Sequence, residues 1–308
     1  MCKYFIARVC FCAGLLTLVA ACVEQGTVSK AGVSVERFHQ PGIGSVNTWI
    51  VEGEESVLVV DAQRTLSAGE LVADRLKQIG KPLAGILITH PHPDHTGGLP
   101  SILAEFPNTP VIGTQGVADE IVSDSLGMFG FARRVNGDEY PTRVPEITQI
   151  IAGEEILTFG DIEIVVDDIG PSESIAMTLF HMPSNDLVFI GDMADNNMYG
   201  FVLEKRTKLW LEQIESVLSI YGDRSLAAYP GHGDVAGLET LLEQQAVWLN
   251  DMRELTLAKL DDQELSDDEV ERVIAEFEQR HPNQLPVAPI PQMRALSVRA
   301  VAEELLAD

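Results

Sequence analysis

The stretch LITHPHPDHTGGL, residues 87–99, follows an apolar run and decides how the rest of the chain is interpreted. It places three of the chain's seven histidines, His90, His92 and His95, together with Asp94 within six positions. Neutral imidazoles and carboxylates are the usual protein ligands of zinc. The carboxyl end of a buried strand is also where α/β folds place their sites. We therefore predict that this loop binds metal.

The segments before and after this loop have the patterns of strands and helices. Residues 34–60 contain three strand-like segments, and residues 57–60 form a continuous apolar run typical of a strand buried on both faces. Residues 67–79 have helical spacing and end at Gly80, a typical C-terminal stop. Residues 127–145 lack such a pattern and are predicted to be irregular, either as a loop over the site or as a connection packed on the core.

The second half of the chain repeats this organisation. Residues 154–170 are predicted to form a hairpin, and residues 177–182 and 186–192 to form strands. Residues 207–220 carry an apolar stripe at helical spacing, and everything after Gly237 is predicted to be helical. Alternating strands and helices in two halves indicate α/β layers and not separate domains.

The N-terminus has the layout of a secretory signal peptide. A short basic region with Lys3 and Arg8 precedes an apolar stretch over residues 9–19, which is shorter than the ~20 residues of a membrane-spanning helix. The sequence VAAC that ends at Cys22 resembles the lipobox of bacterial lipoproteins, in which the signal is cut before a lipidated cysteine. The alternatives are an ordinary signal peptide with a chance cysteine, and a buried N-terminal helix.

The lipobox resemblance sets the expected location of the protein. It implies a signal peptide over residues 1–21, lipidation of Cys22, and an anchor and linker over residues 22–33. The protein would then be an exported lipoprotein of the bacterial cell envelope, held by lipid on the periplasmic face, with the outer membrane as the expected membrane. All four cysteines lie within the first 22 residues, so the mature chain would rely on its own core and not on disulfides.

The charge of the chain excludes one class of partner. It has 47 acidic and 21 basic residues, for a formal net charge of −26. Such a surface repels phosphate backbones, so we expect no nucleic-acid partner.

The order H-x-H-x-D-H followed by T-G-G in the metal loop resembles the metallo-β-lactamase superfamily. Three other segments resemble the same family. VNTWIVEGEESVLVVDA is similar to its opening hairpin and ends in the acidic residue Asp61; LVFIGD resembles the strand that delivers a bridging carboxylate, here Asp192; and YPGHGD resembles the last metal motif, which contains His232. The resemblance implies a four-layer αββα sandwich over residues 34–236, and residues 237–308 would be a helical C-terminal extension.

The resemblance also implies two divalent metal ions, with zinc expected and iron or manganese as alternatives. The implied ligands are His90 and His92 for the first ion, Asp94, His95 and His232 for the second, and Asp192 between the two. The family usually supplies a third histidine to the first ion, and this chain has none at that place. Counting back from Asp192 puts Glu173 there, while the rival His181 falls inside the next predicted strand.

The predicted function follows from this site. The resemblance implies hydrolysis of an ester, lactone, thioester or related bond of a small-molecule substrate by metal-activated hydroxide, with Asp94 as a catalytic residue that orients the water or shuttles its proton. Asp192 argues against a β-lactamase, because those members generally carry cysteine or serine there. A carboxylate at Glu173 would make the first ion a weaker Lewis acid and favours harder metals. The alternatives are a lipid-anchored binding protein with a degenerate metal site and an iron-dependent redox enzyme of the same fold.

Overall fold

The computed structural model describes residues 22–24, 32–260 and 264–307. The predicted signal peptide, residues 1–21, lies outside these ranges, and so does most of the predicted linker. In the part of the chain that is described, no helix has the length and apolarity to cross a membrane.

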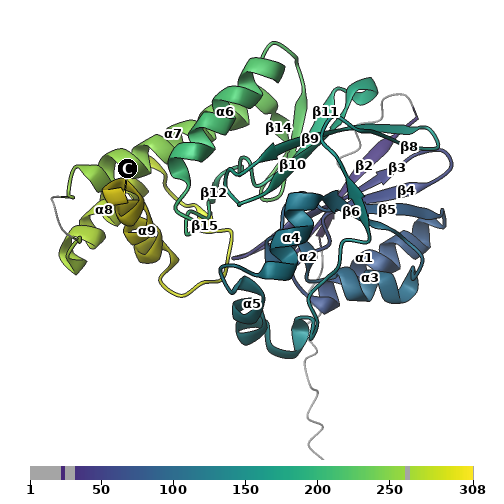
Figure 1. Ribbon diagram of the computed structural model, residues 1–308, viewed down its shortest axis with the longest axis horizontal. Coiled ribbons are helices and arrows are strands. Elements are labelled where there is room, and N and C mark those ends of the chain that lie inside the picture. The colour runs from purple at the N-terminus through teal and green to yellow at the C-terminus, as the bar shows by residue number, and fades with distance from the viewer. Residues whose placement is uncertain (1–21, 25–31, 261–263, 308) are drawn as a thin grey trace, which may run out of the picture.

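The first sheet has seven strands arranged in chain order, β1 to β7. Figure 1 labels β2 to β6 of this sheet. Strands β1 to β4 are antiparallel, and β4 to β7 are parallel. Its strands are β1 (Cys22–Glu24), β2 (Ser34–His39), β3 (Asn47–Glu52), β4 (Val57–Val60), β5 (Leu83–Leu87), β6 (Val111–Thr114) and β7 (Gln149–Ile151). All four residues of β4 are buried, as the apolar run predicts.

The second sheet has six strands in the order β14-β13-β11-β10-β9-β8. Its strands are β8 (Ile156–Phe159), β9 (Ile162–Gly170), β10 (Met177–Met182), β11 (Leu187–Gly191), β13 (Ala227–Pro230) and β14 (Ala236–Gly237). Two short parallel strands, β12 (Met198–Tyr199) and β15 (Leu285–Pro286), pair separately and join the C-terminal part of the chain to the second half.

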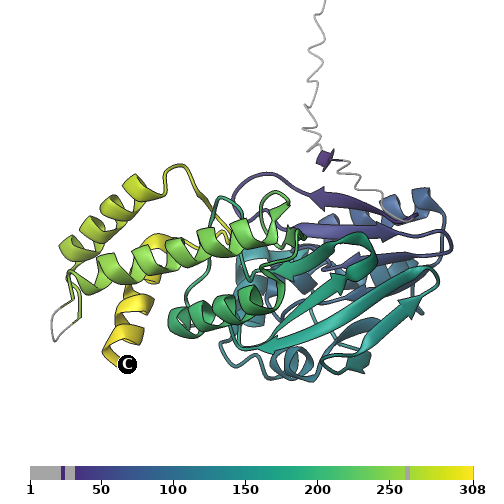
Figure 2. The same cartoon turned by 90° about the horizontal axis from the view of Figure 1, so that it is seen from above.

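Helices cover the outer faces of both sheets (Figure 2). They are α1 (Leu66–Ile79), α2 (Pro93–Thr96), α3 (Leu99–Glu105), α4 (Gln115–Ser123), α5 (Met128–Asn136), α6 (Thr207–Tyr221), α7 (Leu238–Leu257), α8 (Asp267–Arg280) and α9 (Met293–Ala307), with short 3-10 turns η1 (Gly137–Glu139) and η2 (Pro183–Asn185). As predicted, α1 ends at Gly80, whose φ of 75° is the left-handed conformation that glycine adopts without strain.

Three apolar layers separate the four layers of structure. Successive residues of a strand face opposite sides of its sheet. In β3, Ile50 accordingly belongs to the same buried cluster as Val72 of α1, whereas Val51 belongs to the cluster that includes Phe180 of the second sheet. The third layer joins the second sheet to α6 and to the C-terminal helices. The predicted αββα sandwich with C-terminal helices is therefore confirmed.

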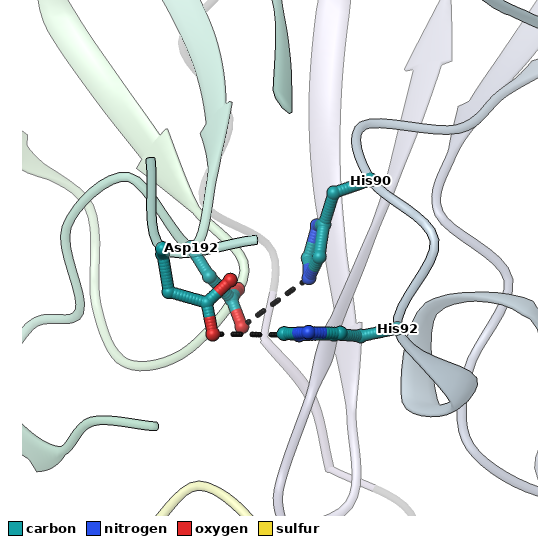
Figure 3. A group of neighbouring side chains, drawn as sticks. His90, His92 and Asp192 are labelled. Atoms are coloured by element: carbon teal, nitrogen blue, oxygen red, sulfur yellow. Dashed lines mark ion pairs between the residues drawn. The ribbon is translucent and has the colours of Figure 1, made fainter. Parts of the chain in front are cut away.

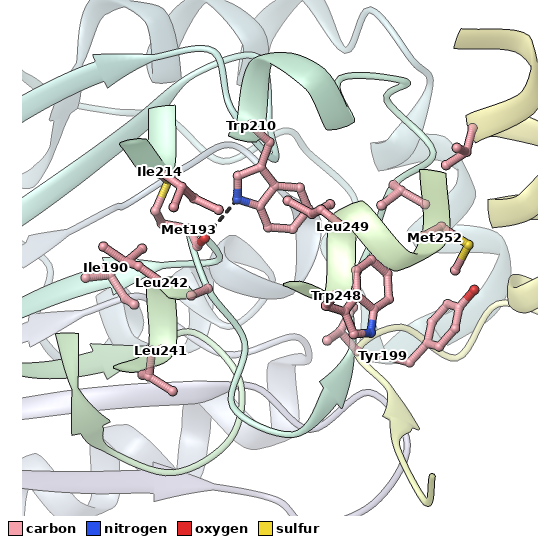
Figure 4. Packing of buried hydrophobic residues seen from close by; sticks show 14 of the residues in the cluster. Ile190, Met193, Tyr199, Trp210, Ile214, Leu241, Leu242, Trp248, Leu249 and Met252 are labelled. Carbon is pink, nitrogen blue, oxygen red and sulfur yellow. Dashed lines mark hydrogen bonds between the residues drawn. The ribbon is translucent and has the colours of Figure 1, made fainter. Parts of the chain in front are cut away.

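The C-terminal helices share this third core with the second half of the sandwich (Figure 4). Trp210 of α6 is buried there and donates its indole N–H to the carbonyl of Met193 over 2.8 Å. Trp248 of α7 packs edge-on against Tyr199, with ring centroids 5.3 Å apart. The indole of α6 in the sandwich and that of α7 in the C-terminal part are thus buried in one cluster, which holds the C-terminal helices on the sandwich.

Two expectations about secondary structure were wrong. Residues 127–145 are not irregular throughout, because they contain α5 and η1. Met128, Phe131 and Val135 have helical spacing, but a helix of nine residues with glycines at both ends gives only a weak pattern. The chain after Gly237 is not helical throughout either: residues 281–292 contain four prolines, which interrupt helices, and include the strand β15.

Candidate metal centre

Side chains from both sheets converge where their strands end. His90 and His92 follow β5, and Asp94 and His95 lie in the short helix α2. Asp192 directly follows β11 in the second sheet. In Figure 3 the rings of His90 and His92 point toward the Asp192 side of this meeting point.

The structure brings the predicted ligands into two adjacent groups. In each group one potential ligand atom per residue lies within 4.8 Å of all the others. The first group is His90, His92, Glu173 and Asp192, and the second is Asp94, His95 and His232. Glu173 therefore lies at the position predicted for the missing third histidine. The rival, His181, lies in β10 and packs its ring 5.1 Å from that of Tyr221, outside both groups.

Asp192 lies between the two groups. Its Oδ2 is 3.6 Å from Nε2 of His90 in the first group and 3.2 Å from Nε2 of His232 in the second. Its Oδ1 is 3.4 Å from Nε2 of His95. Within the first group, Nδ1 of His92 is 3.4 Å from Oε1 of Glu173. Two ligand atoms about 2.1 Å from one tetrahedral ion lie about 3.4 Å apart, so these distances suit a shared metal ion.

Several of these atoms have no other role among the described residues. They are buried and have no hydrogen-bond partner there: Nε2 of His90, His95 and His232, both carboxylate oxygens of Glu173, and Oδ1 of Asp192. Buried polar atoms in proteins are almost always paired, because an unpaired one loses its hydration without compensation. A set of buried nitrogen and oxygen atoms without hydrogen-bond partners, gathered around one point, therefore fits the ligands of divalent metal ions.

The other nitrogen of each histidine ring contacts an oxygen atom of the protein. The pairs are His90 Nδ1 with Thr89 Oγ1 (2.9 Å), His92 Nε2 with Glu204 Oε1 (2.9 Å), His95 Nδ1 with Asp61 Oδ2 (2.8 Å), and His232 Nδ1 with the Ser45 carbonyl. The hydroxyl of Thr89 itself donates to Asp61, so it accepts from His90. Each ring thus donates outward and has its inner nitrogen facing the centre as the atom available to bind a metal ion, as in metal-binding histidines.

Two glycines near the centre lie so close to neighbouring atoms that no side chain would fit there. A side chain at Gly231 would place its Cβ 2.0 Å from Oδ1 of Asp192, and one at Gly97 would place it 1.9 Å from the carbonyl of Arg64. Asp61 has a φ of 58°, which is unusual for a residue other than glycine, and it accepts hydrogen bonds from the N–H and hydroxyl of Thr89. Such local strain is typical of functional sites.

The carboxylates of the centre differ in their electrostatic surroundings. Burial opposes ionisation of Asp94, but the guanidinium of Arg64, 2.9 Å away, and the ring of His95 outweigh it and hold the pKa of Asp94 well below its usual range. For Glu173, burial and the charges of Asp192 and Glu204 all act in one direction and raise its pKa well above the usual range. Glu173 therefore needs a neighbouring positive charge to ionise.

The pKa values of the histidines in the second group also reflect the negative charge that surrounds them. Burial lowers the pKa of His232, but Asp192 and Asp94 outweigh it and raise that pKa to about 10. Burial likewise opposes protonation of His95, and Asp192 and Asp61 overcome it and raise the pKa of His95 well above 6.5. In each case the surrounding carboxylates attract a cation.

Sequence reasoning missed three residues around the centre. Glu204 and Arg64 belong to no metal motif, and only the fold brings them to His92 and Asp94. Asp195 forms a further group with Asp192 and His232, and both of its carboxylate oxygens are buried without a hydrogen-bond partner in the described part of the chain. Its position three residues after Asp192 was the one signal available in the sequence.

Comparison with known sequences and structures places these observations in context. The sequence model described as the metallo-beta-lactamase superfamily matches residues 41–232. A hydroxyacylglutathione hydrolase of Shewanella halifaxensis (strain HAW-EB4) is 42% identical over 78 residues, which are 24% of this chain and 29% of that protein. One of Actinobacillus pleuropneumoniae serotype 3 (strain JL03) is 30% identical over 127 residues, 40% of this chain and 52% of that protein. The chain thus spans about half or less of the length of these relatives.

A solved structure shows the same fold over most of the chain. A metallo-beta-lactamase from Pontibacter korlensis superposes with a TM-score of 0.60 at 17% identity, over 74% of this chain and 99% of that one. At this identity the likeness concerns the fold alone.

Proposed function

Because the chain belongs to the metallo-beta-lactamase superfamily, we propose that it is a metal-dependent hydrolase of an ester, lactone, thioester or related bond. The observation that carries this proposal is the pair of adjacent ligand groups that meet at Asp192, whose inward-facing atoms are buried and unpaired. The names of the relatives, hydroxyacylglutathione hydrolases, support a hydrolytic reaction.

The donor set suits two divalent ions, for which we propose zinc. The first ion would take His90, His92 and Glu173, the second Asp94, His95 and His232, and Asp192 would be shared. Imidazole nitrogens and carboxylate oxygens suit zinc, while the oxygen donor of Glu173 keeps iron and manganese as alternatives. When bound, such ions lower the pKa of water and polarise the bond that is attacked.

The residues of the chain would position the reaction. The guanidinium of Arg64 keeps Asp94 ionised and fixes its Oδ2, which also lies 3.4 Å from Nε2 of His232. Asp94 is therefore held as a carboxylate at a fixed place beside the second group, and the catalytic role we propose for it is to accept a hydrogen bond from the attacking water and orient it. Glu204 and Asp61 hold the rings of His92 and His95, so the ligand geometry does not have to form at each turnover.

The direct experiment combines metal content with hydrolysis. The protein from Val23 onward is purified under mild conditions, its metal content is measured by elemental analysis, and p-nitrophenyl acetate, simple lactones and acyl thioesters are offered as substrates. We expect metal-dependent turnover that chelation abolishes and added zinc restores. His281→Ala is the matched control for ligand variants, because His281 pairs with Asp251 away from the centre. Metal without any hydrolysis would favour the binding-protein alternative, and oxygen-dependent chemistry with iron would favour the redox one.

We also propose that the protein is anchored by lipid at Cys22 on the periplasmic face of the cell envelope. The support is the signal-peptide layout and the VAAC sequence at residues 19–22. Expression of the full chain and its Cys22→Ser variant in a bacterium, followed by membrane fractionation, tests the anchor. Equal membrane association of both proteins would contradict it.

A further inference from the structure

A cavity of about 370 Å³ opens directly beside the candidate metal centre. His92, Asp94 and Asp192 lie in its lining, so whatever occupies it contacts the groups that would hold the ions. We propose that this cavity binds an apolar chain, and hence that the substrate is a lipophilic ester, lactone or thioester. This inference rests on the proposed function and specifies its substrate class.

One wall of the cavity comes from the helix that the sequence pattern did not reveal. Met128, Phe131 and Val135 lie at helical spacing on α5 and line the cavity on one side. Leu126, just before this helix, also lines it, although 55% of this residue is exposed. The apolar face of α5 is thus directed at the cavity.

The second wall lies next to a candidate ligand. Phe201 packs edge-on against His92, with ring centroids 5.0 Å apart, and Leu203 lines the cavity beside it. The next residue, Glu204, is the partner of His92 Nε2. The same short segment therefore supplies both the support of a ligand and an apolar surface beside it.

The third wall comes from the C-terminal part of the chain. Val287 and Ile290 line the cavity from the segment after β15, and Leu296 lines it from α9. This segment is fixed to the centre, because Arg64 donates to the carbonyl of Val287 over 2.7 Å and also donates to Asp94. The C-terminal helices thus complete the cavity.

The charges in the lining leave little for a polar substrate to bind. Asp94 and Asp192 belong to the candidate centre, and Arg64 is paired with Asp94. The other charged side chain there, Arg134, is exposed and lies over the ring of Phe131, 5.8 Å from its centroid. A peptide conjugate with several carboxylates would find few matching charges, whereas a hydrocarbon chain finds walls from three segments.

The exposed apolar residues point to the same occupant. Leu126, Val135 and Leu296 are 55%, 41% and 40% exposed although all three line the cavity. Large apolar side chains left in water around a cavity mark a surface that a ligand covers. The volume also falls in the range of about 300–1,000 Å³ usual for small-molecule sites.

Chain length provides a quantitative test of this inference. Each buried methylene contributes about 0.8 kcal/mol, which is about a fourfold gain in kcat/KM. With p-nitrophenyl esters from acetyl to decanoyl, we expect kcat/KM to rise with chain length until the cavity is filled. A second series, alkyl acetates of increasing alcohol length, shows whether the chain lies on the acyl or the alcohol side. A flat profile in both series would overturn the proposal.

Filling the cavity should change this profile. Ala288 lines the cavity, so Ala288→Trp should lower the ratio of decanoyl to acetyl kcat/KM at least tenfold. Ala104→Trp places the same side chain on an exposed position of α3 and should leave the ratio as in the unaltered protein. An unchanged ratio in Ala288→Trp with a folded protein would contradict the assignment of the cavity.

A binding measurement separates this inference from the proposed function. Calorimetric titration of the full chain with 1-decanol and 1-butanol needs no turnover. We expect decanol to bind at least tenfold more tightly, and Ala288→Trp to remove most of that difference. If no ester, lactone or thioester is hydrolysed but decanol is preferred, the proposed reaction fails and the apolar cavity stands. Equal affinity for both alcohols would overturn the cavity proposal even in an active hydrolase.

Discussion

The two ligand groups of the candidate centre differ in how firmly the protein holds them. In the second group, Asp94 is paired with Arg64 over 2.9 Å and His95 with Asp61 over 2.8 Å. In the first group, neither carboxylate oxygen of Glu173 has a hydrogen-bond partner among the described residues. Two ligands of the second group are therefore held in place before an ion arrives, while Glu173 of the first group is not.

This difference bears on the order in which the groups bind metal. The low pKa of Asp94 keeps it ionised, because Arg64 outweighs the effect of burial. An ion must displace protons at both groups, because the pKa of Glu173 is raised in the first and those of His95 and His232 are raised in the second. Because Asp94 and His95 are held by partners while Glu173 is not, we expect the second group to bind its ion more tightly than the first.

The largest effect should come from the residue that both groups share. Asp192→Asn removes the negative charge between them, so both ions should bind more weakly and kcat/KM should fall by about 10³-fold, since a metal ion supplies several kcal/mol. Elemental analysis and ester hydrolysis, with His281→Ala as control, measure both effects. If Asp192→Asn retained two ions and near-normal turnover, the two groups would not share a carboxylate.

Substitution of Glu173 should affect one group alone. Glu173→Ala should reduce the metal content from two ions per chain to one. It should also lower kcat/KM by more than about 100-fold, which exceeds the effect usual for a residue that only supports a metal ligand. Glu173→His should restore the second ion, because imidazole is an equally good zinc ligand. Two ions in Glu173→Ala would show that another donor completes the first group.

The outer partners allow a matched comparison of the two groups. Glu204→Gln weakens the support of His92 in the first group, and Asp61→Asn that of His95 in the second. Each should lower metal affinity about 10–100-fold, and each for its own ion. A competing chelator should remove the two ions in two separate phases, and each phase gives the metal affinity of one group. A loss in the same phase for both variants would mean that the groups are not independent.

The smallest effect concerns pH in the metal-free protein. Asp192 outweighs burial and raises the pKa of folded His232 to about 10 from the ordinary 6.5. The stability contributed by the protonated ring is fully present below about pH 6.5 and is lost as the pH rises through about 10. The Tm of the chelated protein should therefore fall more between pH 7 and pH 10 than that of chelated His232→Gln. Parallel profiles would remove His232 from this account.

Local sequence carries much of the fold and of the ligand set, but not the surroundings of the site. His90 and His95 lie on one short loop whose residue types predict metal binding, whereas Asp192 and His232 each follow a strand and were predicted through the resemblance to the metallo-β-lactamase superfamily. Glu173 required counting back from Asp192, because no motif surrounds it.

The remaining residues of the site depend on contacts distant in sequence. Glu204 reaches His92 across 112 positions, and Arg64 reaches Val287 across 223. No local pattern encodes such pairs. The helix α5 was missed for a related reason. Its short apolar face lines a cavity that the C-terminal segment completes, and no local pattern shows that contact.

The central claim is a centre of two metal ions completed by Glu173. The most direct measurement is the metal content per chain by elemental analysis, made on the protein from Val23 onward and on its Glu173→Ala variant after reconstitution with zinc, manganese or iron. We predict two ions per chain for the unaltered protein and one for the variant. One ion or none in the unaltered protein, with all three metals offered, would contradict the claim.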